Sequence, residues 1–149
     1  MEKTFELKAV ELGMAVDCKY IASETSDDNI TSENEYHVKV ARPIHLDLRD
    51  LFEKDLTRIV CTVLNVTEDY PVIPTGVSFA GKNDNIGIRI SGTIATAFGY
   101  VKFKTPRIKY KTGETKVDAE LTIWVDKLIN EVYAFLFDNK MAEMEVFGE

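Results

Sequence analysis

The apolar residues of this chain follow two different periods, and the same order of periods occurs twice. Before residue 41, apolar and polar residues alternate along three short segments, which is typical of strands with one buried face. Apolar residues then recur every three or four positions over 48–64, which indicates an amphipathic helix. Alternating segments follow again, and a second stretch of helical period covers 117–136. The sequence therefore predicts an α+β protein of antiparallel sheets and two long helices, in the order βββα-βββ(β)α.

The element boundaries follow from turn-forming and capping residues. The predicted strands are 5–9, 16–22 and 36–40 in the first half, and 76–81, 87–94, 100–104 and 107–111 in the second. Between strands we expect an acidic loop at 23–32, a rigid connector with two prolines at 68–74 and a turn at 82–85. The first helix is predicted to have Asp47 as its N-cap and to end at Asn65.

The second helix is predicted to begin at a sequence like a capping box, 115–118, and to end near Asn139. A chain of 149 residues with 45% hydrophobic residues is long enough to bury one core. We therefore expect a single domain over 1–140, followed by an acidic tail over 141–149.

Composition predicts the cellular compartment. Cys18 and Cys61 lie in segments of apolar period, which is typical of small buried side chains in a reducing environment. Residues 1–5 lack the pattern of a secretory signal, and no segment has the apolar length of a membrane span. The two cysteines and two histidines have scattered spacing that fits no zinc pattern. We expect a protein of the cytoplasm with no membrane association, no metal and no cofactor.

The order of elements, three strands and a helix followed by three or four strands and a helix, resembles that of the Whirly and Pur families. The resemblance is topological and covers most of the chain, with a first half one strand shorter than in those families. It implies a duplicated sheet-then-helix unit that binds single-stranded nucleic acid across its sheet surface. Proteins of this kind often assemble through sheet edges or helices, so we expect a homo-oligomer.

Positive charge is concentrated in one part of the chain. Residues 72–112 contain a single acid, Asp84, and seven basic residues: Lys82, Arg89, Lys102, Lys104, Arg107, Lys109 and Lys111. This segment carries 7 − 1 = +6, so the remainder of a chain of net charge −7 carries −13. Such separation of charge predicts one surface that attracts a polyanion on a protein that otherwise repels it.

Strand periodicity predicts that these cations share a face. Tyr100, Lys102 and Lys104 alternate with apolar residues, and so do Arg107, Lys109 and Lys111. A bulge at Thr105 and Pro106 would shift the alternation by one residue and bring both rows to one surface. The predicted nucleic-acid-binding residues are Arg89, Tyr100, Lys102, Lys104, Arg107, Lys109 and Lys111. Phe98 is a further candidate for base stacking, whereas Phe103 and Tyr110 are assigned to the core.

Other interpretations of these residues stay open. Lysines on exposed strands also prevent edge-to-edge aggregation, which accounts for some of the cations. His37 and His45 are isolated histidines, and the acids at the start of the first helix are typical of a solvated face. No phosphate-binding glycine loop or nucleophile motif occurs. We therefore predict no catalytic residue and no enzymatic activity.

The C-terminal tail offers a linear motif. The run Glu143-Met144-Glu145-Val146-Phe147 resembles the clamp-binding peptide of bacterial replication proteins, whose pattern is Gln-Leu-x-Leu-Phe. The resemblance implies that Met144, Val146 and Phe147 bind a sliding clamp or another replication protein, although Glu143 replaces the glutamine. The alternative is that these three apolar side chains pack back on the domain.

Four segments resemble small proteins of bacteriophages and prophages of gut bacteria. They are 43–48, 76–81, the turn Asn83-Asp84-Asn85 and 130–137. The resemblance implies a phage setting, in DNA replication or recombination inside a bacterial host cell, and carries no site residue. The sequence thus predicts a non-enzymatic single-stranded DNA-binding protein. The alternative function is a phage interaction or inhibitor protein that binds a host factor through its acidic surface.

Overall fold

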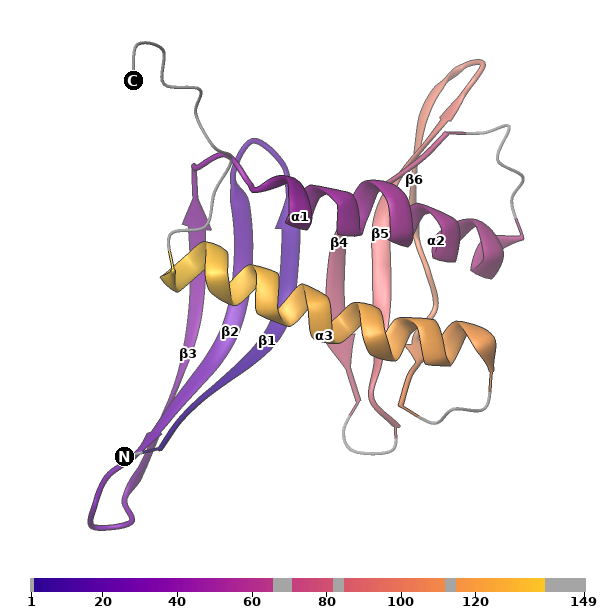
Figure 1. Cartoon of the computed structure of the whole chain (residues 1–149). Coiled ribbons are helices and arrows are strands. Elements are labelled where there is room, and N and C mark those ends of the chain that lie inside the picture. The colour runs from indigo at the N-terminus through magenta and orange to yellow at the C-terminus, as the bar shows by residue number, and fades with distance from the viewer. Residues whose placement is uncertain (1, 66–70, 82–84, 112–114, 139–149) are drawn as a thin grey trace.

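The strands of both halves of the sequence join one antiparallel sheet (Figure 1). The computed structural model describes residues 2–65, 71–81, 85–111 and 115–138. The strands are β1 (Glu2–Leu12), β2 (Val16–Thr25), β3 (Thr31–Val40), β4 (Val72–Ala80), β5 (Gly87–Thr96), β6 (Gly99–Lys104) and β7 (Ile108–Lys109). Their order is β3-β2-β1-β4-β5-β6, and β7 pairs with β5 beyond the end of β6. The predicted α+β class and the order of strands and helices are confirmed.

The two halves meet through their first strands. β1 pairs with β4 at Ala9–Ser78, Val10–Val77 and Glu11–Gly76, and the later strands of each half follow outward on either side. Each half is therefore a strand meander, and the two run away from a common centre. This arrangement fits a duplicated unit, but the two units share one continuous sheet.

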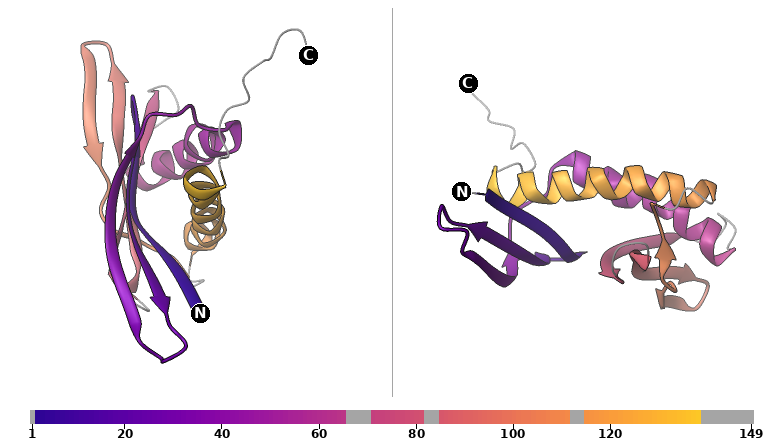
Figure 2. Two further views of the ribbon diagram at one scale, coloured as in Figure 1. Left: turned by 90° about the vertical axis from the view of Figure 1, so that its left-hand side faces the viewer. Right: turned by 90° about the horizontal axis from the view of Figure 1, so that it is seen from below.

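Both helical segments cover the same face of the sheet (Figure 2). The first consists of α1 (Leu46–Asp50), the π-helical segment η1 (Leu51–Leu56) and α2 (Thr57–Leu64), which follow one another without a break. The second is α3 (Lys116–Phe137), which runs alongside across the strands. The other face of the sheet carries none of the described helices, and we call it the open face.

Strand pairing assigns each residue to one of the two faces. Cys18, Val10, Val77 and Ile90 form one row across four strands, and each is at most 3% exposed. Because successive side chains of a strand point to opposite faces, the neighbouring row of Asp17, Glu11, Gly76 and Ser91 lies on the open face. The helix-covered face is thus apolar, and the open face is polar.

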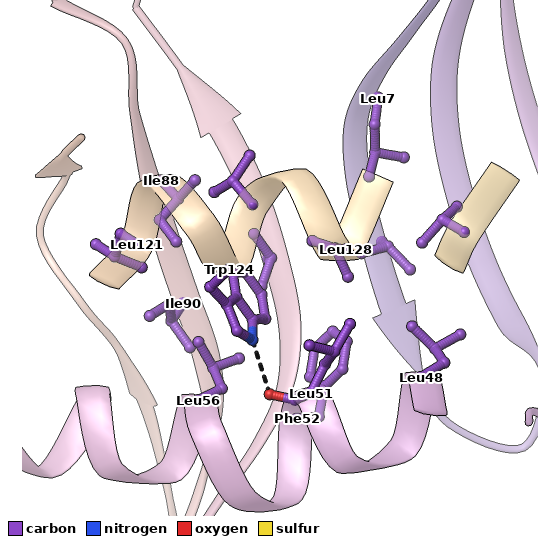
Figure 3. Packing of buried hydrophobic residues seen from close by; sticks show 14 of the residues in the cluster. Leu7, Leu48, Leu51, Phe52, Leu56, Ile88, Ile90, Leu121, Trp124 and Leu128 are labelled. Atoms are coloured by element: carbon purple, nitrogen blue, oxygen red, sulfur yellow. Dashed lines mark hydrogen bonds between the residues drawn. The ribbon is translucent and has the colours of Figure 1, made fainter. Parts of the chain in front are cut away.

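The core lies between the sheet and the two helices (Figure 3). Trp124 of α3 is at its centre and meets the ring of Phe52 edge-on, with 6.0 Å between the ring centroids. The labelled neighbours are Leu7, Leu48, Leu51, Leu56, Ile88, Ile90, Leu121 and Leu128. Burial of each large apolar side chain contributes about 1.5–3 kcal/mol, so this cluster holds the helices on the sheet.

The π-helical turn of the first helix is matched by a specific hydrogen bond from α3. In a π turn the backbone hydrogen bonds join residues five apart instead of four, so the carbonyl groups of the turn have different N–H donors from those in an α-helix. The Trp124 indole Nε1 donates to the carbonyl oxygen of Leu51 at 2.9 Å, and the Thr57 hydroxyl donates to that of Phe52 at 3.3 Å. The indole bond therefore joins the two helices as well as satisfying two buried polar groups.

The helix ends follow the sequence in part. Asp47 as the first N-cap is wrong, because the residue in that position is His45, whose Nδ1 accepts from the Asp47 backbone N–H at 3.1 Å. Asn65 does end the first helix, in a left-handed conformation with φ of 54°. The second N-cap is confirmed: the Thr115 hydroxyl accepts from the Asp118 backbone N–H at 3.0 Å. The described helix ends at Phe137.

Most strands are longer than the sequence predicted, whereas β7 covers only Ile108–Lys109 of the predicted 107–111. The acidic loop expected at 23–32 shrinks to 26–30, because β2 and β3 stay paired as far as Thr25 and Thr31. The connector expected at 68–74 ends sooner, since β4 begins at Val72. Pro74 fits within β4 because the pairing with β5 shifts between Pro74 and Gly76, where the missing N–H breaks no ladder bond.

Replacing Trp124 with Phe should lower the free energy of unfolding by about 1–3 kcal/mol, because the buried Leu51 carbonyl loses a donor. Urea titration followed by circular dichroism measures the change. The neighbouring variant Ile123→Ala is the control, because Ile123 is exposed and its loss should alter stability by less than about 0.5 kcal/mol. Equal stability of Trp124→Phe and wild type would contradict the role given to this bond.

Candidate nucleic-acid interface

Pairing between β5 and β6 places three of the predicted site residues on the open face. Lys104 lies opposite Ser91, which belongs to the open-face row, and Lys102 and Tyr100 follow at two-residue steps. Their partners on β5 are small: Ser91, Thr93 and Ala95. The long side chains of Tyr100, Lys102 and Lys104 therefore project beyond the short side chains of the neighbouring strand. Tyr100 is 73% exposed, so its ring is available to a ligand.

A bulge at Thr105 and Pro106 brings the next cations to the same face. The Thr105 backbone N–H donates to the Ile90 carbonyl oxygen at 2.8 Å, and its hydroxyl accepts from the Ile90 N–H at 2.9 Å. After this residue the pairing continues with Ile108 opposite Ile88, which inserts one extra residue relative to the pairing of β6. The parity shift predicted from the sequence is present, and Arg107 and Lys109 lie on the open face.

Glycine makes room for Arg107. A Cβ atom on Gly87 would lie 2.7 Å from the Arg107 Cγ, and one on Gly81 would lie 3.1 Å from its Nη1. The arginine side chain therefore lies flat across the backbone of these two residues. Extending the pairing of β5 and β7 by one residue puts Arg107 opposite Arg89, which is itself exposed on the open face. Two like charges in opposing positions repel unless an anion lies between them.

We call the group Arg89, Tyr100, Lys102, Lys104, Arg107 and Lys109 the basic patch. None of its five cations has a carboxylate within 4.0 Å among the residues that the structure describes. β4 to β7 present no described acid on the open face. As far as the described residues go, the basic patch is therefore uncompensated, and its positive potential extends into solvent.

Lys111 does not belong to the basic patch. Its φ is 72°, and its backbone N–H donates to the Thr122 hydroxyl of α3 at 2.9 Å. The chain has thus turned toward the helices before Lys111, and strand alternation no longer applies. Lys111 instead lines a hollow under α3, together with Leu7 and Val125. Its predicted place beside Arg107 and Lys109 is wrong for this reason.

The aromatic residues near the basic patch are buried or exposed as the strand alternation in the sequence predicts. Phe103 packs against the core, and Tyr110 is 2% exposed. Burial, with a smaller effect from Asp126, raises the pKa of Tyr110 to about 12. Phe98 is fully exposed at the tip of the β5–β6 hairpin, so it remains a candidate for base contact next to Tyr100.

The other half of the open face has the opposite charge. Among the residues whose side chains the structure describes, β1, β2 and β3 present Lys19 and five acids there: Glu6, Glu11, Asp17, Glu33 and Glu35. Lys8 is paired with Glu6, and Lys39 lies 4.0 Å from Asp17. The open face thus changes sign near the β1–β4 boundary, so a polyanion would be confined to the second half.

A hollow at this boundary brings together Asp17, His37 and Lys104, which the sequence pattern did not connect. It has a volume of about 250 Å³ and a floor that includes Ala9, Gly76 and Ser91. On its rim the Nε2 of His37 lies 2.5 Å from the Asp17 Oδ1, and Lys104 of the basic patch stands on the opposite side. Only strand pairing could have revealed this, because Asp17 and His37 are far apart in sequence. The arrangement resembles a surface ion pair, and the imidazole has no second hydrogen bond or ion pair within the described part of the chain.

Two further kinds of site find no support in the described part of the chain. Among those residues no group of three or more His, Cys, Asp or Glu side chains is arranged to hold a metal ion. No described helix is both long and apolar enough to cross a membrane. The tail residues Met144, Val146 and Phe147 lie outside the described residues, and their role stays a prediction.

Comparison with known proteins adds no family. No protein-family model, curated protein or solved structure matches the chain. The function must therefore be argued from the residues and their geometry.

Replacing Thr105 with Val should destabilise the bulge that aligns the two cation rows. Valine keeps the shape but leaves the buried Ile90 N–H without an acceptor, which should cost about 1–3 kcal/mol of unfolding free energy. The Ile90 amide should also exchange with deuterium faster, as measured by NMR. Thr105→Ser keeps the hydroxyl and should retain most of the stability. Equal exchange rates in Thr105→Val and wild type would contradict this account.

Proposed function

We propose that this protein binds single-stranded DNA across the second half of its open face and catalyses no reaction. The supporting observation is the basic patch: five cations without carboxylate partners among the described residues, beside an exposed tyrosine, on a sheet face free of helices. Cations neutralise phosphates, and an exposed ring stacks on bases without requiring a particular sequence.

The spacing of the basic patch favours an extended strand. Lys102 and Lys104 lie two residues apart on β6, so their Cα atoms are separated by roughly 6.5–7 Å. That distance is comparable with the separation of successive phosphates in an extended single strand. Arg89 and Arg107 form a second point of phosphate contact on the neighbouring strands, because an anion between them would relieve their repulsion. A backbone that crosses β6 toward β5 would meet both points.

The charge of the whole protein limits the interaction to this region. With a net charge of −7, the protein repels polyanions at long range, and the acids of the first half of the open face add to that repulsion. Attraction acts only close to the basic patch, within about 10 Å at moderate salt. We therefore expect binding that weakens strongly as salt is raised.

The acidic half of the open face supports a second candidate function. Glu33 and Glu35 on β3 are exposed and could meet a basic partner protein, as an interaction or inhibitor protein would require. Under that function the basic patch is merely solvated. Charge reversal in the basic patch distinguishes the two, because it would then leave the partner interaction intact.

The double variant Lys102→Glu/Lys104→Glu should abolish binding of a labelled oligothymidine, measured by fluorescence anisotropy. For wild type, five phosphate contacts predict a slope of log K against log salt of about −3.5. The control Lys54→Glu/Lys127→Glu changes two exposed lysines of the helical layer and takes the net charge to the same value, −7 − 4 = −11. It should bind nearly as wild type does. Salt-independent binding, or equal loss in both double variants, would refute the proposal.

Replacing Tyr100 with Ala should weaken the same interaction by about 1–3 kcal/mol, or roughly 5- to 150-fold in the dissociation constant, since one stacked base is lost. The salt slope should stay unchanged because no phosphate contact is removed. Tyr100→Phe keeps the ring and should bind as wild type does. If both substitutions weaken binding equally, the hydroxyl and not ring stacking is responsible.

A further inference from the structure

One edge of the sheet is long, regular and unpaired. β3 pairs with β2 without interruption from Val40 opposite Val16 to Thr31 opposite Thr25, and none of the strands that the structure describes lies on its other side (Figure 1). Its ten residues contain neither a proline nor a bulge. A strand of this kind offers a full row of free backbone groups to another strand.

The opposite edge of the sheet is built differently. β6 has six residues, carries Lys102 and Lys104, and is followed by Pro106. Short length, lysine and proline are the usual means by which natural edge strands avoid pairing. β3 instead carries both acidic and basic residues. Whether β3 repels another strand or pairs with it therefore depends on the charges of the strand that lies opposite.

The sequence of β3 is complementary to itself in antiparallel orientation. If Tyr36 lies opposite Tyr36 of a second copy, Glu35 lies opposite His37 and Glu33 lies opposite Lys39. By two-fold symmetry each of these pairs occurs twice, and all four side chains point to the open face. The opposite charges of Glu33 and Lys39 in such cross-strand positions stabilise a pair of strands, and His37 brings no second acid opposite Glu35. The alignment also overlaps nearly the whole of Thr31–Val40 with its copy.

Other registers are less favourable. Faces match only when the register shifts by two residues. A shift in one direction puts Glu35 opposite Glu35 of the second copy. A shift in the other direction puts His37 opposite His37 and Glu35 opposite Lys39, but it leaves Glu33 opposite Ala41, beyond the end of β3, and shortens the overlap to 34–40. The alignment centred on Tyr36 is favoured because it avoids opposing acids and overlaps nearly the whole strand.

The aromatic residues on the helix-covered face of β3 favour the same alignment, centred on Tyr36. Tyr36 stacks on Tyr20 with 5.1 Å between ring centroids, and Tyr20 and Phe137 are both in contact with Phe5. Tyr36 is nevertheless 41% exposed, on the side where the sheet ends. A second copy in the chosen alignment would place its own Tyr36 on that side and extend the aromatic cluster across the contact.

We propose that two copies of this chain associate through their β3 edges, antiparallel about Tyr36, into a dimer with one continuous sheet. The contact is isologous, the commonest arrangement among soluble oligomers. It uses charges of β3 that the basic patch does not contain, so it stands apart from the proposed DNA binding.

The dimer has a consequence that does rest on the proposed function. The two basic patches lie on the same open face at opposite ends of the joined sheet. From β5 of one copy to β5 of the other there are 4 + 1 + 4 interstrand steps, or roughly 43 Å at about 4.8 Å each. An oligonucleotide that reaches both patches should bind more tightly than one that covers a single patch.

The first test measures the mass of the protein without nucleic acid. Sedimentation equilibrium should give twice the chain mass of 16.9 kDa for wild type. Glu33→Lys/Glu35→Lys should give the monomer mass, because lysines then face Lys39 and His37 of the second copy. The control Glu53→Lys/Asp126→Lys makes the same charge change on the helical layer and should remain dimeric. A monomeric wild type would overturn the proposal whatever the outcome of DNA binding.

The second test restores the contact by exchanging charges. His37→Glu/Lys39→Glu should also be monomeric alone, but a mixture of it with Glu33→Lys/Glu35→Lys should form a heterodimer, since every lysine of one strand then lies opposite a glutamate of the other. Circular dichroism melts of each variant confirm that both are folded. Association of Glu33→Lys/Glu35→Lys with Lys102→Glu/Lys104→Glu instead would show head-to-tail pairing of β3 with β6 and would overturn the two-fold contact.

The third measurement separates the two proposals. Wild type should bind a long oligothymidine more tightly than a short one, and Glu33→Lys/Glu35→Lys should lose this difference while it still binds the short one. A dimer that binds no oligothymidine keeps the β3 contact and refutes only the DNA-binding function. A dimer with no preference for the longer strand would show that the two patches do not act together.

Discussion

The ladder between β1 and β4 is the interaction on which the rest of the structure depends. It joins two strand meanders through only three residue pairs, and the apolar row of Cys18, Val10, Val77 and Ile90 crosses it on the side of the helices. Both helical segments run across this boundary, and the indole of Trp124 ties one to the other through the carbonyl of Leu51. A short ladder is sufficient because the helical layer spans both halves and buries the junction.

The two halves share an architecture but differ in charge. One half presents Glu33 and Glu35 at its edge strand, and the other presents Lys102 and Lys104 at its own. Because the helices cover only one face, both sets of charges remain in solvent on the same side. A single surface thus offers an acidic region and a basic region, separated by a floor of small residues such as Ala9 and Gly76. Each region has room for its own partner.

The sequence predicted most of the fold, because its periods of two and of three to four residues report directly on local structure. It also predicted the parity shift at Thr105, since Lys104 and Arg107 could share a face only through a bulge. It failed where local alternation stops being informative. The start of β3 is exposed on both faces, so its polar sequence resembles that of a loop. Lys111 follows a change of backbone direction that depends on Thr122 of α3. The pair Asp17 and His37 needed the register of β2 and β3, which no local pattern contains.

The position of Arg107 above Gly87 shows that a binding surface can depend on a residue with no functional group. The side chain of Arg107 lies over the sheet because position 87 has no Cβ, and a Cβ atom there would also lie 2.7 Å from the carbonyl oxygen of Ile108. Exchange of Gly87 for any larger residue would therefore displace a cation without removing one.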